Sequence, residues 1–224
     1  MMTFTYYGHS CFLIDTGKEK LLFDPFLTGN DKAAIAAGDV SCDYILLSHA
    51  HADHFGDADA IARRTGAAVI AIPEVIGLFS KDVTRFYPMN LGGTVKLPLG
   101  KVTMVPALHS AGVAGGVACG FLIQFTSGVN VYYAGDTALF GDMKLIGEKA
   151  DIDYAVLPIG DNYTMGPEDA VKAAILLGAK RVIPVHYNTW PVIGQDPAAF
   201  EALAEDKGVA VHIVPVGGKL ALVK

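Results

Sequence analysis

The sequence has few cysteines and no motif that would pair them. Cys11, Cys42 and Cys119 lie far apart in the chain, and no Cys-x-x-Cys occurs. This absence argues against both a disulfide framework and a thiolate zinc site. We therefore expect three small buried hydrophobic residues in a cytoplasmic protein.

Positive charge is scarce as well. The chain carries 17 Lys and Arg against 23 Asp and Glu, a formal net charge of −6, and no basic run exceeds Arg63-Arg64. A nucleic-acid binder normally carries a basic stripe that neutralises phosphates. Nucleic acid is therefore not expected as the main partner, and a small-molecule substrate is. Nothing in the sequence indicates whether the chain forms a homo-oligomer.

Long apolar runs are missing. The most apolar stretch, 107–123, is interrupted by His109 and Ser110, whereas a membrane-spanning helix needs about 20 predominantly apolar residues. The first residues lack the basic region and the apolar core of a signal peptide. No low-complexity linker divides the chain, so we expect no membrane span and one domain over residues 1–224.

What the sequence does contain is a strand–helix–strand unit that occurs twice. The first copy is an apolar strand at 43–47, a helix at about 54–65 and a strand at 67–72. The second copy has the same parts in the same order, at 153–157, 167–177 and 181–185. A last helix near 197–207 and a strand at 209–214 follow. Strand runs combined with two such units predict two sheets packed face to face with helices outside.

The strongest chemical signal is the run His49-Ala50-His51-Ala52-Asp53-His54, directly after the first apolar strand. Side chains two apart on an extended turn project the same way, so His49 and His51 can hold one ion. Asp53 and His54, at the entry to the helix, can face a second ion beside it. Imidazole and carboxylate ligands without thiolate suit divalent zinc, manganese, iron or nickel.

Further ligands must come from distant strand ends, because one motif cannot complete two coordination spheres. His109, Asp136 and His186 each stand where a predicted strand gives way to a loop. A rigid sheet can present such side chains to a common site. Taken alone, each residue would more often lie on the surface or in the core, but the first motif favours the metal interpretation.

These residues resemble the pattern of the metallo-β-lactamase superfamily, which is His-x-His-x-Asp-His followed by a His, an Asp and a final His. The match spans nearly the whole chain. Within that superfamily the chain is similar to the bacterial and archaeal metal-dependent hydrolases related to L-ascorbate-phosphate lactonase and to the phospholipase D that cleaves N-acylphosphatidylethanolamines. Five runs carry the finer resemblance, at 8–10, 23–26, 135–137, 158–162 and 186–189.

The resemblance implies an α/β fold, the four-layer αββα sandwich, in which two mixed sheets pack together with helices on the outside. It also implies two divalent metal ions per chain. The implied ligands are His49, His51 and His109 on the first metal, Asp53, His54 and His186 on the second, and Asp136 as the bridge. The activity implied is hydrolysis of a small ester-like substrate, either a lactone or a phosphodiester.

Two metals about 3.5–4 Å apart can share a water, lower its pKa towards about 7 and so provide a bridging hydroxide that attacks the substrate. They would also stabilise the charge that develops on the substrate oxygen. Asp53 is the expected catalytic residue, since a ligand carboxylate can also orient the attacking water. His9, Asn162, Tyr187 and water are candidates for the leaving-group acid.

Several neighbouring residues allow two interpretations each. His9 either lines the pocket or bonds to backbone, and Asp24 either supports a ligand histidine or belongs to a turn. Asn162 either caps the next helix or faces the site. Tyr187 and Trp190 either form a pocket wall or pack in the core.

Other functions remain open at this point. The same scaffold supports iron-dependent oxidoreductases, including mononuclear dioxygenases. Diiron flavoproteins of the superfamily replace the second histidine of the first motif with Glu, whereas this chain keeps His51. A metal-dependent nuclease is disfavoured by the acidic charge balance, and a non-catalytic metal-binding protein by the intact ligand pattern.

Overall fold

Two seven-stranded sheets form the centre of the computed structural model, which describes residues 1–224. Apolar and β-branched runs supply the strands, because such side chains pack well on a pleated surface. The first sheet has the order β14-β1-β2-β3-β4-β5-β6. Its strands are β1 (Met2–Gly8), β2 (Cys11–Asp15), β3 (Lys20–Phe23), β4 (Tyr44–Leu46), β5 (Ala68–Ala71), β6 (Phe86–Pro88) and β14 (Lys219–Leu222).

The second sheet has the order β13-β12-β11-β10-β9-β8-β7. Its strands are β7 (Thr94–Leu97), β8 (Gly100–Pro106), β9 (Cys119–Phe125), β10 (Asn130–Tyr133), β11 (Tyr154–Pro158), β12 (Arg181–Val185) and β13 (Ala210–Val211). Counted from β14 in the first sheet and from β7 in the second, three antiparallel pairs are followed by three parallel pairs. This shared pattern makes β4 and β5 the counterparts of β11 and β12, which confirms the repeat predicted from the sequence.

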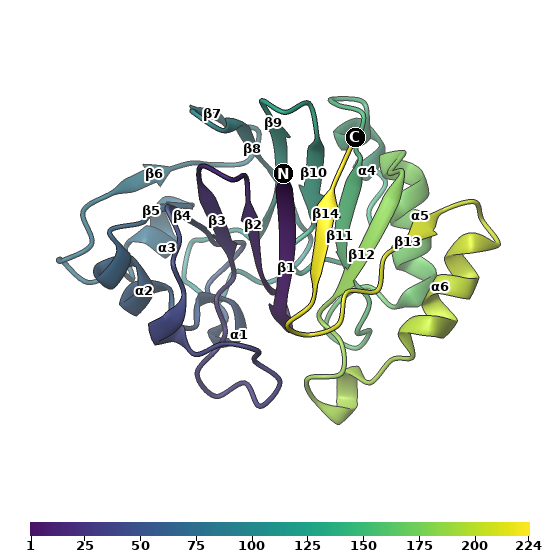
Figure 1. Cartoon of the computed structure of the whole chain (residues 1–224), viewed down its shortest axis with the longest axis horizontal. Helices are drawn as coiled ribbons and strands as arrows, with labels where there is room; N and C mark the ends of the chain where they lie inside the picture. Colours follow the sequence, from purple (N-terminus) through teal and green to yellow (C-terminus); the bar gives the residue numbers. More distant parts are fainter.

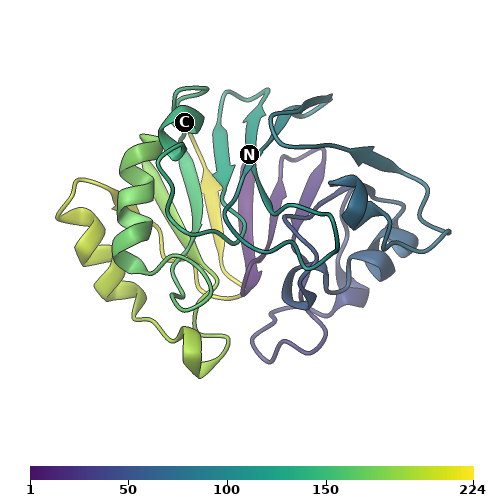
Figure 2. The same cartoon turned by 180° about the vertical axis from the view of Figure 1, so that it is seen from behind.

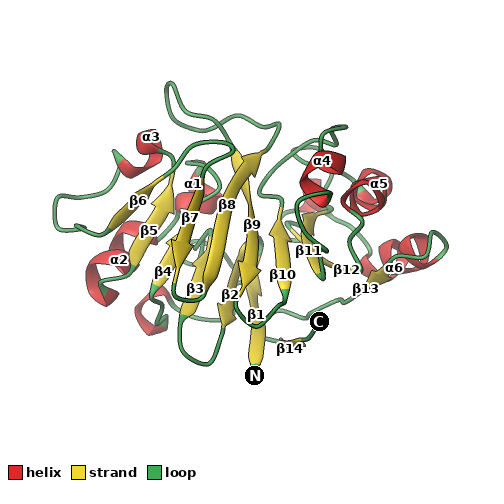
Figure 3. Ribbon diagram, turned by 90° about the horizontal axis from the view of Figure 1, so that it is seen from above, coloured by secondary structure: helices red, strands yellow, loops and turns green.

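The helices lie on the two outer sides of the sheet pair (Figures 1 and 2). On the side of the first sheet these are α1 (Ala52–Phe55), α2 (Ala58–Thr65) and α3 (Pro73–Ile76), and on the other side α4 (Met143–Gly147), α5 (Pro167–Leu177) and α6 (Pro197–Glu205). Figure 3 shows the strands between the two helix groups. Two short 3-10 turns are η1 (Ala37–Asp39) and η2 (Pro191–Ile193). The arrangement is the αββα sandwich that the resemblance implied. None of the helices has the length and apolar character that crossing a bilayer requires.

Aromatic stacking joins the two sheets near the ends of β3 and β10. Phe12 stacks on Phe4 and on Phe23, with ring centroids 4.9 and 4.3 Å apart. Tyr133, from the second sheet, meets Phe12 and Phe23 edge-on at 5.0 and 5.6 Å. All four rings are fully buried, and such edge-to-face packing fixes ring orientation as well as burying area. The core therefore holds Tyr133 firmly where β10 ends. The three cysteines are free and buried, as expected.

Two predicted elements differ from the structure. The helix expected at 54–65 is broken into α1 and α2 at Gly56, whose φ of 40° is not helical. Only glycine fits here, since an added Cβ would collide with the backbone of Pro25 and Phe26. The carboxylate of Asp57 then accepts the backbone N–H groups of Leu27 and Thr28. The strand expected at 209–214 is only β13, two residues long.

Candidate metal centre

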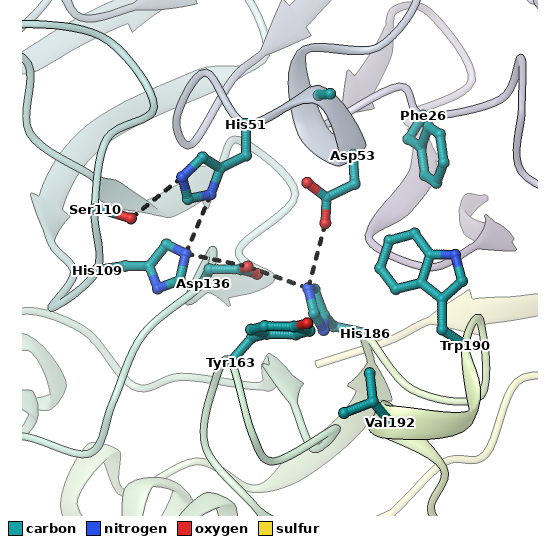
Figure 4. A pocket seen from close by; sticks show the side chains of 11 residues that line it. Phe26, His51, Asp53, His109, Ser110, Asp136, Tyr163, His186, Trp190 and Val192 are labelled. Carbon is teal, nitrogen blue, oxygen red and sulfur yellow. Dashed lines mark hydrogen bonds and ion pairs between the residues drawn. The ribbon is translucent and has the colours of Figure 1, made fainter.

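The seven predicted ligands meet at one edge of the sheet pair. Figure 4 shows His51, Asp53, His109, Asp136 and His186 among them. The 49–54 run follows β4, and the other three residues follow β8, β10 and β12 respectively. Strand β4 runs parallel to its neighbours in the first sheet, and β10 and β12 run parallel to β11 in the second, so in each sheet these ligands follow the carboxyl ends of parallel strands. The topology thus gathers residues that are far apart in sequence, and most of their side chains are buried.

Three histidines form the first ligand group. His51 Nδ1 lies 2.9 Å from His49 Nε2 and 3.3 Å from His109 Nε2. Nitrogens bound at about 2.0–2.1 Å around a tetrahedral zinc are ~3.3 Å apart. The separations from His51 Nδ1 to the other two nitrogens are therefore close to those that one divalent ion would require.

Asp136 connects this group to the second one. Its Oδ2 lies 3.6 Å from His109 Nε2 in the first group. The same oxygen is 3.3 Å from His54 Nε2 and 3.1 Å from His186 Nε2. Asp53 Oδ2 completes the second group at 3.8 and 3.9 Å from those two nitrogens. The Asp136 carboxylate thus stands between the groups, as a bridging ligand would.

Several of the converging atoms have no hydrogen-bond partner. His54 Nε2, His186 Nε2 and Asp136 Oδ1 are buried and unpartnered. Leaving such an atom unsatisfied costs about 1–3 kcal/mol, so unpartnered atoms rarely converge without a reason. A divalent cation would satisfy all three, and the donor set of imidazoles and carboxylates fits zinc, manganese, nickel or iron.

His49 and Asp136 have the ionisation states of metal ligands. Burial opposes protonation of His54, but the Asp136 and Asp24 carboxylates outweigh it and raise the pKa of that ring well above its ordinary value. Burial, together with the charge on His54, lowers the pKa of His49 to about 2, so this ring is neutral. Burial opposes ionisation of Asp136, but His54 and His186 outweigh it and hold the pKa of that carboxyl well below its ordinary value. Metal ligands must be neutral imidazole or ionised carboxylate, and both residues meet that requirement.

Asp24 orients His54 through the ring nitrogen that faces away from the other ligands. This fully buried carboxylate accepts hydrogen bonds from Ser48 N at 2.9 Å, Ser48 Oγ at 2.6 Å and the Tyr133 hydroxyl. Its Oδ2 also lies 2.8 Å from His54 Nδ1, which leaves His54 Nε2 facing the site. Ser48 Oγ lies 2.9 Å from His49 Nδ1 as well. One Asp–Ser pair therefore orients a histidine of each group, the kind of support that metal ligands commonly receive.

His9 connects the 49–54 run to the loop after β12. Its Nε2 lies 3.1 Å from Asp53 Oδ2, and its Nδ1 lies 2.8 Å from Thr189 Oγ1. Its backbone oxygen accepts the N–H of His186 at 2.8 Å. Burial lowers the pKa of His9 to about 4, so the ring is neutral, and a carboxylate acceptor requires the proton on Nε2.

Three residues of the site have left-handed backbone conformations. The φ angles of His9, Asp24 and His186 are 55°, 38° and 56°. Residues other than glycine seldom adopt such angles, and strain of this kind tends to cluster at functional sites. At all three positions the backbone turn directs a side chain into the same polar cluster.

A cavity of about 580 Å³ opens over the ligands. Its lining residues are Phe26, His51, Ala52, Asp53, His109, Ser110, Asp136, Tyr163, His186, Trp190 and Val192. Trp190 thus takes the pocket-wall alternative. Tyr187 does not line this cavity and packs instead against a buried apolar cluster that includes Leu157, Ile159 and Phe200. Asn162 is exposed and does not cap α5, whose N-cap is Gly166.

Sequence reasoning missed some of the residues that shape the site. Ser48 directly precedes His49, so its position beside the first motif was a usable signal. Tyr133 carried none, because its partner Asp24 lies 109 residues away along the chain. Thr189 belongs to the run 186–189 of the family resemblance, but its contact with His9, 180 residues away, could not be predicted. Phe26 and Tyr163 lie in irregular loops, and only the folded chain places them at the pocket.

Comparison with known proteins places the chain in a family. The profile of the β-lactamase superfamily domain matches residues 11–187. A UPF0173 metal-dependent hydrolase of Thermus thermophilus is 47% identical over 226 residues, covering 99% of this chain and 100% of that one. One from Natranaerobius thermophilus is 47% identical over 206 residues, covering 92% of each chain.

A solved structure agrees with the sequence comparison. Igni18, described as a metallo hydrolase from the archaeon Ignicoccus hospitalis, superposes with a TM-score of 0.90 at 36% identity. The match covers 98% of this chain and 97% of that one. The chain therefore belongs to the metallo-β-lactamase superfamily and, within it, to the UPF0173 family of metal-dependent hydrolases.

Proposed function

We propose that the chain hydrolyses a small ester-like substrate, a lactone or a phosphodiester, with the help of two divalent metal ions. The observation that supports this most directly is the position of Asp136, whose Oδ2 lies within 3.6 Å of histidine nitrogens from both groups. Two ligand groups sharing one carboxylate are what a pair of adjacent ions needs. In this proposal residues 1–224 form one domain.

The ligand assignment follows the two groups of side chains. One ion would be held by His49, His51 and His109, the other by Asp53, His54 and His186, with Asp136 shared. Bound in this way, divalent ions supply an activated water near neutral pH and polarise the oxygen of the scissile group.

Asp53 is the residue of the set best placed to act on the attacking water. Its side chain is 24% exposed and lines the cavity, whereas His54 and His186 are almost fully buried. Burial opposes its ionisation, but the hydrogen bond from His9 and the charge on His54 hold the pKa of Asp53 below its ordinary value. An ionised carboxylate at the cavity surface accepts a hydrogen bond from water and so orients it.

The leaving-group proton comes from water in this proposal. Three protein candidates follow from the sequence, His9, Asn162 and Tyr187, and none lines the cavity. His9 Nε2 is already committed to Asp53. Solvent reaches the cavity past its exposed rim, which includes Tyr163 and Val192.

The test is metal-dependent turnover of a γ-lactone and of bis(p-nitrophenyl) phosphate by chelated and reloaded protein. Asp53→Asn should lower kcat at least about 100-fold on the preferred substrate, while Asp82→Asn, at an exposed position, serves as the matched control. Full turnover by Asp53→Asn with both metals bound would remove the orienting role. Activity that survives chelation would contradict the proposed function itself.

A further inference from the structure

Apolar side chains from three separate loops form part of the cavity wall. Phe26 comes from the loop after β3, Tyr163 from the loop before α5, and Trp190 and Val192 from the loop after β12. The Phe26 and Trp190 ring centroids lie 6.1 Å apart. Figure 4 shows Phe26, Trp190 and Val192 on one side of the space and His51 and His109 on the other, with Tyr163 between them. We call Phe26, Tyr163, Trp190 and Val192 the aromatic wall.

The aromatic wall is left open to solvent. Tyr163, Trp190 and Val192 are 54%, 36% and 51% exposed, although all three are large apolar side chains. Exposed apolar side chains that line a concave site beside polar ligands are typical of a surface that binds the apolar part of a small molecule. The cavity is also within the size range of small-molecule sites, about 300–1,000 Å³.

Positive side chains are absent from the same cavity. None of its lining residues is Lys or Arg, and its ionisable groups are the carboxylates of Asp53 and Asp136 together with the ligand histidines. Ser110 adds one neutral hydroxyl, 3.2 Å from His51 Nε2. Proteins that grip a phosphate or a second carboxylate usually supply a guanidinium, an ammonium or a set of backbone N–H groups for it. Beyond the proposed metals, no lining side chain offers an anionic group a guanidinium or an ammonium.

We propose that the substrate is an uncharged carboxylic ester or lactone whose apolar acyl group packs on the aromatic wall. This rests on the proposed function and selects one of its two substrate classes. Water adds to the acyl carbon and the bond from that carbon to the ester oxygen breaks, giving a carboxylic acid and an alcohol. A lactone gives a single hydroxy acid by the same step. The absence of Lys and Arg from the cavity disfavours phosphodiesters, and also esters that carry an added phosphate group.

Trp190 allows binding to be measured apart from catalysis, because it is the only tryptophan of the chain. We would titrate metal-loaded protein with 5-nonanone and with dibutyl phosphate, which carry the same two butyl groups on a neutral carbonyl and on an anionic phosphoryl group. The expected result is a saturable change in tryptophan emission, with a Kd for the ketone at least tenfold lower than for the phosphate. Equal or tighter binding of dibutyl phosphate would overturn the inference.

Steady-state kinetics with a series of esters test whether the aromatic wall binds the acyl group. Along p-nitrophenyl acetate, butyrate and hexanoate, kcat/KM should rise by about two- to fourfold for each methylene that the wall buries. Tyr163→Ala should lower the hexanoate-to-acetate ratio, whereas Leu145→Ala, which removes an exposed apolar side chain on α4 outside the cavity, should not. A flat series, or faster metal-dependent hydrolysis of bis(p-nitrophenyl) phosphate, would overturn the inference and leave the proposed function standing. No metal-dependent hydrolysis of either class would contradict both.

Discussion

At the scale of single residues, His9 connects three segments of the chain at the site. Its ring reaches Asp53 on one side and Thr189 on the other, and its backbone oxygen holds the N–H of His186. These contacts tie the loop after β1 to the 49–54 run and to the loop after β12. A single buried imidazole therefore sets the spacing between parts of the chain that carry proposed ligands.

The neutral state of His9 gives the folded chain a definite pH dependence. Its pKa is about 4 in the folded chain against 6.5 for an ordinary histidine, so the unfolded chain binds more protons between these values. The free energy of unfolding should therefore fall as pH decreases from 6.5 to 4, with up to about 3 kcal/mol due to His9. Urea unfolding in the presence of chelator at pH 7 and pH 4.5 measures this decrease in the free energy of unfolding.

The matched variant for this prediction is His9→Asn, since asparagine tolerates the left-handed backbone at this position. The variant should lose less stability than the native chain between the two pH values, because residue 9 then has no group that takes up a proton in this range. Equal losses in both proteins would show that His9 does not contribute to the pH dependence.

At the scale of elements, the loop between β8 and β9 determines where His109 lies. The backbone N–H of Ala50 bonds to the oxygen of Ala111 at 2.8 Å, which fastens this loop to the 49–54 run. Gly112 makes the close approach: its φ is 68°, and an added Cβ would lie 2.7 Å from His51 N and from His51 Cδ2. Its lack of a side chain lets His51 and His109 share one site.

Gly112→Ala should therefore push the loop away from His51 and weaken metal binding by the first ligand group. Gly115→Ala is the matched control, because Gly115 also has a positive φ, 76°, but an added Cβ there meets nothing within 4 Å. The control should cost about 1 kcal/mol of stability from backbone strain alone, and Gly112→Ala about 2 kcal/mol more. Urea unfolding and metal titration of both variants measure the difference. Similar values for the two variants would contradict the proposed packing.

Much of this element scale could be predicted from the sequence, because it depends on local patterns. The strands before His49, Asp136 and His186 are short apolar runs, and a ligand residue at a strand end can be recognised without a fold. The break at Gly56 could not be predicted, since it comes from the approach of Pro25 and Phe26 across the structure. The outer strands β6, β7 and β14 also escaped prediction, because each has only three or four residues and most of them are not buried.

At the scale of the whole molecule, the site lies where the two sheets meet. The Tyr133 hydroxyl, from the second sheet, donates to Asp24 at the end of the first, and Asp24 in turn orients His54. The first ligand group combines residues that follow β4 and β8, and the second combines residues that follow β4, β10 and β12. Each proposed ion would thus link both halves of the sandwich.

The pocket wall shows the limit of prediction at this scale. Trp190 was one of two alternatives from the sequence, and Phe26, Tyr163 and Val192 were not recognised. They lie in loops that follow different elements, and nothing in their local sequence indicates that they line one cavity. A ligand set can be recognised from residue types and spacing, whereas a substrate pocket depends on how the loops pack.

The central claim is that two metal ions occupy the two ligand groups, and elemental analysis of protein purified without chelator tests it most directly. We expect close to two divalent ions per chain, with a lower content in His51→Ala and in His186→Ala. His212→Ala, which removes a histidine outside both groups, should leave the content unchanged. One iron per chain that His186→Ala does not affect would contradict the account, and so would the absence of metal under every loading condition.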